Sequence, residues 1–260
     1  MVIELFGPPG VGKTTFAHAL AVRLRERGFG ATLALSYRPS EDLTVADSAN
    51  TVRRWFPTLR RVTRPIIESF TAVSRLPRDS CEARAATALR NLFPPHDAVM
   101  ALKHRQYMLR LSRAWHDAAR ADDIVLFDQA FVQLICTLAP LARAARSGDL
   151  ETALDTVPQP DLLVRLTAPL DVLTARLAER RRRLSTIERL LELDMETNLK
   201  SREIADRLHR LLQQHNRMSV CIETSDRRSL RTGVDQVEEI IGGIRKRPAI
   251  RSGAAFEETA

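Results

Sequence analysis

A glycine-rich segment near the amino terminus combines the residue types and the spacing that bind phosphate. Residues 7–14 read GPPGVGKT and match the pattern G-x-x-x-x-G-K-[ST] at every fixed position. The glycines allow the backbone to curl so that its N–H groups point at phosphate oxygens, and the start of the following helix adds partial positive charge. In this pattern Lys13 reaches the β- and γ-phosphates, and the Thr14 hydroxyl is a ligand of Mg²⁺.

The segment therefore predicts a site for a nucleoside triphosphate with Mg²⁺. ATP is the expected co-substrate, because the N-K-x-D motif that usually reads guanine in proteins with this loop is absent from the sequence. The residues expected to bind ATP are Gly7, Pro8, Pro9, Gly10, Val11, Gly12, Lys13, Thr14 and Thr15.

A carboxylate at the end of a second apolar segment is the expected partner of this site. Residues 124–127 read IVLF and predict a strand, and Asp128 follows directly. In phosphate-loop folds a neighbouring strand end supplies an acid beside Mg²⁺, often through water. Asp128 is therefore expected to act in catalysis and, with Thr14, to hold the metal. The alternative interpretation is an ordinary aspartate that ends a strand or caps a helix.

An arginine-rich run between two predicted helices indicates a lid at about residues 176–186. Arg176 and Arg180 lie one helical turn apart, so they share a face, and residues 180–183 are all arginine. A mobile arginine can neutralise the charge on a transferring phosphoryl group once the lid closes. The expected catalytic residues are thus Lys13, Asp128, Arg176 and Arg180. The alternative is a solvated run of charge.

Short apolar segments alternate with amphipathic ones, which is typical of a parallel sheet with helices on both faces. The predicted strands are Val2–Phe6, Ala31–Leu35, Ile124–Phe127, Leu162–Leu166 and Ser219–Glu223. The predicted helices cover residues 13–27, 81–92, 97–120, 131–146, 170–182, 185–215 and 229–246. We expect an α/β fold with a doubly wound, mostly parallel five-stranded sheet. A single domain, residues 1–246, is expected to carry it, followed by a loose tail at residues 247–260.

Residues 51–78 do not fit this alternation. They hold seven arginines and one acid, Glu68, so this window carries +6 of the net charge of +8. Their apolar residues follow helical spacing, which Pro57 and Pro65 are expected to interrupt. The segment is interpreted as a helical insertion packed on the core, within an insertion and acceptor region of about residues 48–120. The alternative is a surface for an anionic acceptor or an anionic membrane.

Several local matches, in the right order, resemble the thymidylate-kinase-like group of nucleoside and nucleotide kinases. Beyond the phosphate loop they are the segments Ser36-Tyr37-Arg38-Pro39, His104-Arg105-Gln106, Phe127-Asp128-Gln129-Ala130-Phe131, Pro160-Asp161-Leu162-Leu163, Arg176 to Arg183, and Ile187-Glu188. The resemblance spans about residues 1–225 and implies a P-loop kinase that transfers the γ-phosphoryl group of ATP to a small acceptor.

On the acceptor side the sequence departs from that group. Gln129 stands where the group has an arginine that helps to hold the acceptor nucleotide, and the loop around Arg38 lacks the expected glutamate and glycines. The resemblance therefore implies the kinase machinery and leaves open a nucleotide, a nucleoside, a sugar or another metabolite. The expected acceptor-binding residues are Arg38, Arg105, Gln129 and Gln133.

Composition favours a cytoplasmic protein. Three widely spaced cysteines, at positions 81, 136 and 221, form no C-x-x-C pair, so disulfide and zinc frameworks are not expected. No apolar run approaches the roughly 20 residues of a membrane-spanning helix, and no signal peptide precedes the first strand. The expected partners are ATP and a small-molecule acceptor, and a homodimer remains open.

Two other classes of function also remain open. The first is an ATPase switch that drives a protein or nucleic-acid partner, in which Gln129, beside Asp128, would position water. The second is a nucleic-acid-binding module that uses the arginine-rich segment, although Trp55 and Phe56 are the only aromatic residues beside its first arginines. Acceptor-independent ATP turnover would favour the switch, and steeply salt-dependent affinity would favour the nucleic-acid module.

Overall fold

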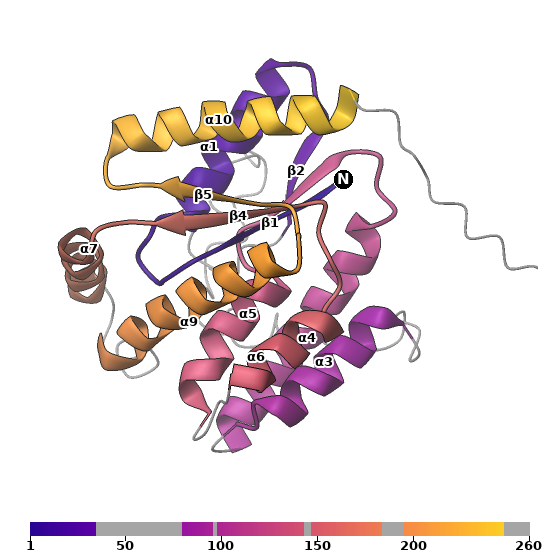
Figure 1. The fold of residues 1–260 in the computed structure, drawn as a ribbon, viewed down its shortest axis with the longest axis vertical. Coiled ribbons are helices and arrows are strands. Elements are labelled where there is room, and N and C mark those ends of the chain that lie inside the picture. The colour runs from indigo at the N-terminus through magenta and orange to yellow at the C-terminus, as the bar shows by residue number, and fades with distance from the viewer. Residues whose placement is uncertain (35–79, 96–97, 143–146, 184–194, 247–260) are drawn as a thin grey trace, which may run out of the picture.

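The computed structural model describes residues 1–34, 80–95, 98–142, 147–183 and 195–246. Five parallel strands form its sheet, in the order β2-β3-β1-β4-β5 (Figure 1). The strands are β1 (Val2–Phe6), β2 (Ala31–Ala34), β3 (Ile124–Phe127), β4 (Leu162–Thr167) and β5 (Ser219–Glu223). Because β1 lies in the centre, the chain that leaves its carboxyl end emerges between the ends of β3 and β4.

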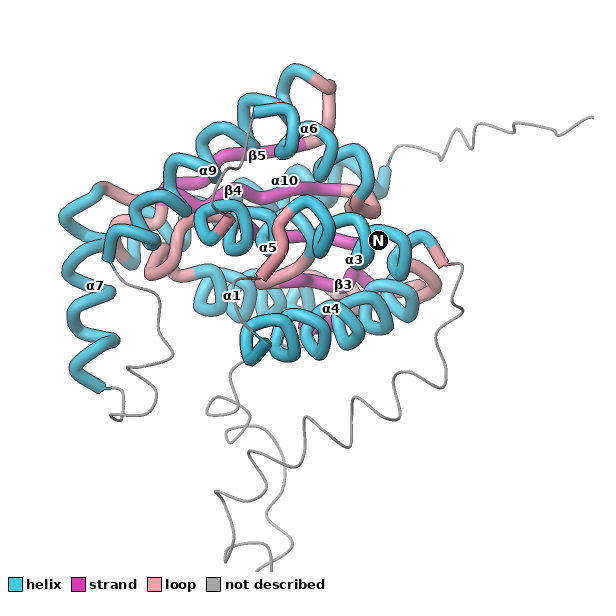
Figure 2. Tube along the Cα trace, turned by 90° about the horizontal axis from the view of Figure 1, so that it is seen from below, coloured by secondary structure: helices cyan, strands magenta, loops and turns pink. Residues whose placement is uncertain are grey.

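Helices cover both faces of the sheet (Figure 1). One face packs against α1 (Lys13–Glu26) and α10 (Arg227–Lys246), and α7 (Leu170–Arg183) follows β4 beyond the edge of the sheet. The helices over the other face are visible in front of the strands in Figure 2. They are α3 (Cys81–Leu92), α4 (Ala98–Ala118), α5 (Phe131–Leu138), the 3-10 helix η2 (Ala139–Leu141), α6 (Ser147–Thr156) and α9 (Met195–Gln214).

Alternating side chains of β1 divide the interior into two cores. Val2 and Phe6 pack with α3, α4, α5, α6 and α9, whereas Ile3 and Leu5 pack with α1 and α10. Successive side chains of a strand point to opposite faces, so Glu4 shares the face of Val2 and Phe6. Glu4 is thus a carboxyl group placed inside an apolar core, with none of its surface exposed.

The predicted α/β fold with a five-stranded parallel sheet is confirmed. The bounds of β1, β3, β5 and α3 coincide with the predicted ones, and those of α1, α4, α7 and α10 differ by a few residues at most. These elements have strong local signals, namely short apolar runs for the strands and apolar stripes at helical spacing for the helices. The predicted helix over residues 185–215 is described only from Met195, where it continues to Gln214.

The prediction of one helix over residues 131–146 was wrong. The α-helix ends at Leu138 and passes into η2, whose second residue is Pro140. Proline has no N–H to donate and its ring crowds the preceding turn, so the α-helix does not continue through it. Helix α6 was not predicted at all, although Leu150, Ala153, Leu154 and Val157 have helical spacing and are buried.

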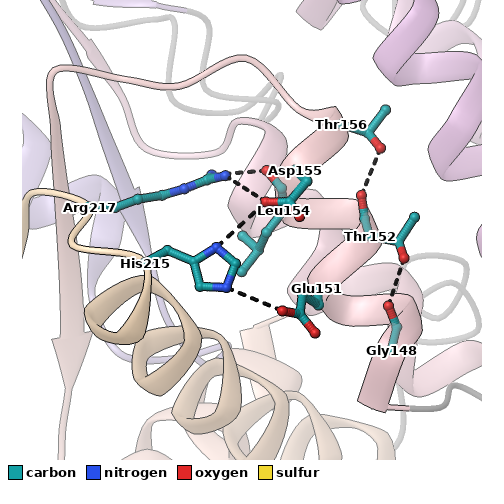
Figure 3. A network of polar contacts seen from close by, with 8 residues as sticks. All are labelled: Gly148, Glu151, Thr152, Leu154, Asp155, Thr156, His215 and Arg217. Carbon is teal, nitrogen blue, oxygen red and sulfur yellow. Dashed lines mark hydrogen bonds and ion pairs between the residues drawn. The ribbon is translucent and has the colours of Figure 1, made fainter.

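Helix α6 is attached to the turn between α9 and β5 by the polar contacts of Figure 3. The Arg217 guanidinium donates to the Leu154 carbonyl at 2.9 Å and lies 3.1 Å from the Asp155 carboxylate. The His215 ring lies 3.3 Å from the Glu151 carboxylate and 3.6 Å from that of Asp155. These contacts join residues about 60 positions apart, so local sequence patterns do not predict them.

Several predictions fall outside the described residues. They concern the loop around Arg38, the basic segment 51–78, the part of the lid that follows Arg183, and residues 247–260. Among the helices that the structure describes, none is both long enough and apolar enough to cross a membrane.

Candidate nucleotide site

The phosphate loop joins the end of β1 to the start of α1, as predicted. Gly12 precedes the helix with a φ of 97°, a left-handed conformation that strains residues with a side chain. Gly7 has a φ of 147°, and a Cβ atom there would collide with the Leu166 carbonyl oxygen of β4. Glycine is thus required at both ends of the loop. Gly12 is required for its backbone conformation, and Gly7 both for its conformation and because no space is left for a side chain.

Lys13 lies across the loop that precedes it. Its Nζ donates to the carbonyl oxygens of Gly7, at 2.8 Å, and of Pro8, at 3.1 Å. The ammonium group is therefore held against the backbone of the loop, at the amino end of α1. A cation in this position adds to the partial positive charge of the helix end, so the site attracts anions.

Thr14 and Asp128 meet at the same place. The Thr14 hydroxyl donates to Asp128 Oδ2 at 2.7 Å, although the two residues are 114 positions apart. The pairing of β1 with β3, which sets Glu4 opposite Phe127, brings Asp128 beside the loop. Asp128 is only 2% exposed, and its Oδ1 is buried without a hydrogen-bond partner among the described residues. A hydroxyl and a carboxylate oxygen that lacks a partner are hard oxygen donors that suit Mg²⁺.

Arg176 connects the loop to two other elements. Its guanidinium donates from α7 to the Val11 carbonyl at 3.3 Å and to the Ser225 carbonyl, after β5, at 2.8 Å. The buried Thr224 hydroxyl donates to the same Val11 carbonyl at 2.7 Å. A Cβ atom on Gly12 would lie 4.0 Å from Arg176 Nη1, so this guanidinium is next to the amino end of α1.

Arg180 follows one turn later on α7 and is partly exposed. The structure thus brings Lys13, Thr14, Asp128 and Arg176 together around the loop, and places Arg180 on the same helix as Arg176. Sequence reasoning missed Thr224 and Ser225, which follow β5. The available signal was their position after the last strand of a parallel sheet, at the carboxyl edge where such sheets bind ligands.

Two buried polar residues, Gln133 and Glu4, support the start of the loop. Gln133, at the start of α5, accepts the Gly7 N–H with its side-chain oxygen at 2.9 Å. The Glu4 carboxyl group accepts the backbone N–H of Gln133 at 2.8 Å through its Oε1 atom. Burial raises the pKa of Glu4 to about 8, because desolvation outweighs the backbone hydrogen bonds from Gln133 and Val132. Glu4 was not selected from the sequence, although an acid in the middle of an apolar strand is an available signal.

The expected acceptor residues have different positions. Gln133 lies against the phosphate loop, where its side-chain oxygen accepts the Gly7 N–H, and its contact with an acceptor stays a prediction. The backbone carbonyl of Gln129 accepts a hydrogen bond from the Tyr107 hydroxyl of α4 at 3.1 Å, so α4 packs against the segment after β3. Arg105 is exposed on α4, and Arg38 lies outside the described residues.

Comparison with known proteins supports the assignment of the fold. A family model described as "ATPase family associated with various cellular activities (AAA)" matches residues 3–80. No curated protein matches the chain. Among the similar solved structures is a deoxyadenosine kinase from M. mycoides with bound dATP, at a TM-score of 0.50 and 11% identity, over 93% of this chain and 100% of that one. The chain therefore has an α/β P-loop NTPase fold of the kind found in a nucleoside kinase.

Proposed function

We propose that this protein is an ATP-dependent kinase that transfers the γ-phosphoryl group to a small acceptor. One observation carries the proposal, namely the surroundings of the buried Asp128 carboxylate. One of its oxygens accepts the Thr14 hydroxyl, and the other has no hydrogen-bond partner among the described residues. Lys13 directly precedes Thr14 at the amino end of α1. This arrangement offers a site for phosphates and a site for a hard cation within one loop. The phosphate loop, the sheet order and the likeness to a deoxyadenosine kinase support it.

Each group has a distinct task in this mechanism. Thr14 and Asp128 would hold Mg²⁺, which neutralises charge on the β- and γ-phosphates when it is bound. The backbone N–H groups of the loop and Lys13 bind the phosphate oxygens and fix the γ-phosphoryl group for in-line attack. Arg176, and Arg180 one turn later, supply positive charge where the transferring group becomes most negative. Closure of the lid over this site excludes water, so that the acceptor is phosphorylated rather than water.

The acceptor is proposed to lie at the carboxyl edge of the sheet, beside α4. Arg38, Arg105 and Gln129 are the proposed contacts. The first two lie in segments that resemble the thymidylate-kinase-like group, and Gln129 stands where that group has its acceptor-binding arginine. The structurally similar protein is a deoxyadenosine kinase, so nucleosides join nucleotides, sugars and other metabolites as candidates. An acceptor phosphate needs no catalytic base because its oxygen is already anionic, whereas a hydroxyl acceptor needs one.

A second candidate function is an ATPase switch. The observation that favours it is the match of residues 3–80 to the AAA family of ATPases. Gln129, directly after the proposed metal ligand Asp128, would then position water for hydrolysis. The two functions differ in one measurable property, since a kinase turns over ATP rapidly only when its acceptor is present.

The experiment is to measure ADP release with a panel of nucleosides, nucleotides, sugars and sugar phosphates, and without any acceptor. We expect slow turnover alone and strong stimulation by one class of acceptor, which becomes phosphorylated. The assay is repeated with Arg38→Ala and Arg105→Ala, and with Arg231→Ala as a control because Arg231 is exposed on α10. Stimulation should be lost in at least one of the first two variants and kept in the control. Rapid turnover without acceptor, equal in all variants, would refute the kinase and support the switch.

A further inference from the structure

We propose that Gln133 is a positioning residue of the phosphate loop, and that Glu4 holds it in place. Its side-chain oxygen accepts the N–H of Gly7, the first residue of the loop, at 2.9 Å. Gln133 is only 6% exposed and Gly7 is buried. The link to ATP binding rests on the proposed function, whereas the role in loop structure does not.

The Gly7 N–H needs a partner at this point because the strand ladder ends there. The pairing of β1 with β4 runs from Ile3 opposite Leu162 to Phe6 opposite Arg165, and Gly7 follows the last of these pairs. The Leu166 carbonyl oxygen lies where a Cβ atom of residue 7 would be, so this position has no side chain of its own that could satisfy the N–H. A buried N–H without a partner loses its hydrogen bonds to water with no compensation. The Gln133 side chain compensates for this loss.

The contacts of Thr137, one turn later, agree with this orientation of the Gln133 amide. The Thr137 hydroxyl donates to the Gln133 backbone carbonyl at 3.0 Å, and Gln133 Nε2 lies 3.5 Å from the same hydroxyl oxygen. Because the hydroxyl donates its proton to the Gln133 carbonyl, its oxygen can act only as an acceptor toward Nε2. The other end of the amide, Oε1, then faces Gly7, and only an oxygen can accept from that N–H.

Glu4 completes a closed chain of hydrogen bonds. It lies on β1 three residues before Gly7, and its Oε1 accepts the backbone N–H of Gln133 at 2.8 Å. Glu4 therefore holds the amino end of α5 against β1. In this position of α5, the Gln133 side chain reaches Gly7 at the end of the same strand. Glu4 and Gln133 thus connect the base of the phosphate loop to the core on the α5 face of the sheet.

This geometry predicts a specific consequence for nucleotide binding. In this arrangement Gln133 bonds to the base of the loop, at Gly7, and acts on ATP through the order of that loop. Without the Gln133 acceptor oxygen the loop is less ordered in the free protein. ATP must then order the loop as it binds, and this lowers the net free energy of ATP binding. We expect Gln133→Met, which keeps a long unbranched side chain, to weaken ATP affinity about tenfold, equivalent to 1.4 kcal/mol. The kcat at saturating ATP should fall much less than the affinity.

The direct test is the exchange rate of the Gly7 amide, which is independent of any enzyme activity. The sequence has two Phe-Gly pairs, Phe6-Gly7 and Phe29-Gly30, so carbonyl-¹³C phenylalanine with ¹⁵N glycine isolates two amide signals in an NMR spectrum. Gly30 serves as the internal reference. We expect at least about tenfold faster exchange at Gly7 in Gln133→Met, with Gly30 unchanged. Gln133→Glu keeps an acceptor oxygen and should restore protection.

Two further variants separate positioning from general stability. Ser112→Ala removes another buried hydrogen bond, from the Ser112 hydroxyl to the Glu82 carbonyl, and should leave Gly7 exchange and ATP affinity unchanged. Thr137→Val removes the hydroxyl that orients the amide and should give a smaller effect in the same direction as Gln133→Met. It also provides the test if Gln133→Met does not fold.

The two possible failures are distinguishable. If the wild-type protein binds no ATP, the proposed function fails, while the Gly7 exchange rates still decide whether Gln133 holds the loop. Unchanged Gly7 exchange in folded Gln133→Met and Thr137→Val would overturn the inference. Faster exchange with unchanged ATP affinity would overturn the positioning role, because the hydrogen bond would then serve the fold alone.

Discussion

Ionisation of Glu4 should make the stability of this protein depend on pH. The side chain is completely buried in β1, and this burial raises the pKa of Glu4 from 4.5 to about 8. Below about pH 4.5 the carboxyl group is protonated in both the folded and the unfolded chain, and above about pH 8 it is ionised in both. Between these values the unfolded chain releases a proton that the folded chain keeps, so the free energy of unfolding falls as the pH rises.

The magnitude follows from the two pKa values. Their difference, from 4.5 to about 8, corresponds at 1.36 kcal/mol per pKa unit to a fall of up to about 5 kcal/mol across the whole window. Between pH 5.5 and pH 8 the same reasoning gives about 3 kcal/mol. Glu4→Gln keeps an oxygen that accepts the Gln133 N–H and has no acidic proton, so this part of the pH dependence should disappear.

The assay is urea denaturation of wild type and Glu4→Gln at pH 5.5 and pH 8, with the midpoint and the slope fitted at each pH. Asp122→Asn is the control, because Asp122 is an exposed carboxylate in the turn before β3. Wild type and control should both lose stability between the two pH values, and Glu4→Gln should lose about 3 kcal/mol less. An equal loss in all three proteins would refute the assignment of a neutral, buried Glu4.

Three further perturbations test other parts of the structure. Lys13→Ala should lower the rate of phosphoryl transfer on the order of 10²–10³-fold, because one preorganised charge is lost. The thermal unfolding curve should stay close to that of wild type. Near-normal turnover by the folded variant would exclude the loop from the mechanism. Asp128→Asn should weaken Mg²⁺-dependent turnover more than Mg²⁺-free nucleotide binding, as measured by metal titration, whereas equal losses would indicate a structural role. Arg217→Met should lower the free energy of unfolding, measured with denaturant, by about 1–3 kcal/mol, because the Leu154 carbonyl loses its donor while the nucleotide site stays intact. An unchanged free energy of unfolding would show that this hydrogen bond does not stabilise the fold.

Neighbouring residues in the sequence determined the phosphate loop. Its glycines have the conformations that the pattern requires, and a buried strand and an amphipathic helix flank it as expected. The same holds for the five strands, because each is a short, mainly apolar segment whose signal lies within the segment itself. Local patterns failed where a single residue mattered, since Pro140 interrupts the helix predicted over residues 131–146.

The partners of these local elements were decided by the tertiary structure. Sequence reasoning placed Asp128 opposite the loop by analogy with other folds, but the bond to Thr14 depends on β3 lying next to β1. The acceptor role expected for Gln133 stays a prediction, whereas its hydrogen bond to the Gly7 N–H depends on the packing of α5 on β1. Glu4 received no role from the sequence, because a carboxyl group in a strand acquires its raised pKa only when other elements bury it. Conformation is encoded by adjacent residues, whereas burial and long-range hydrogen bonds exist only once the sheet order is set.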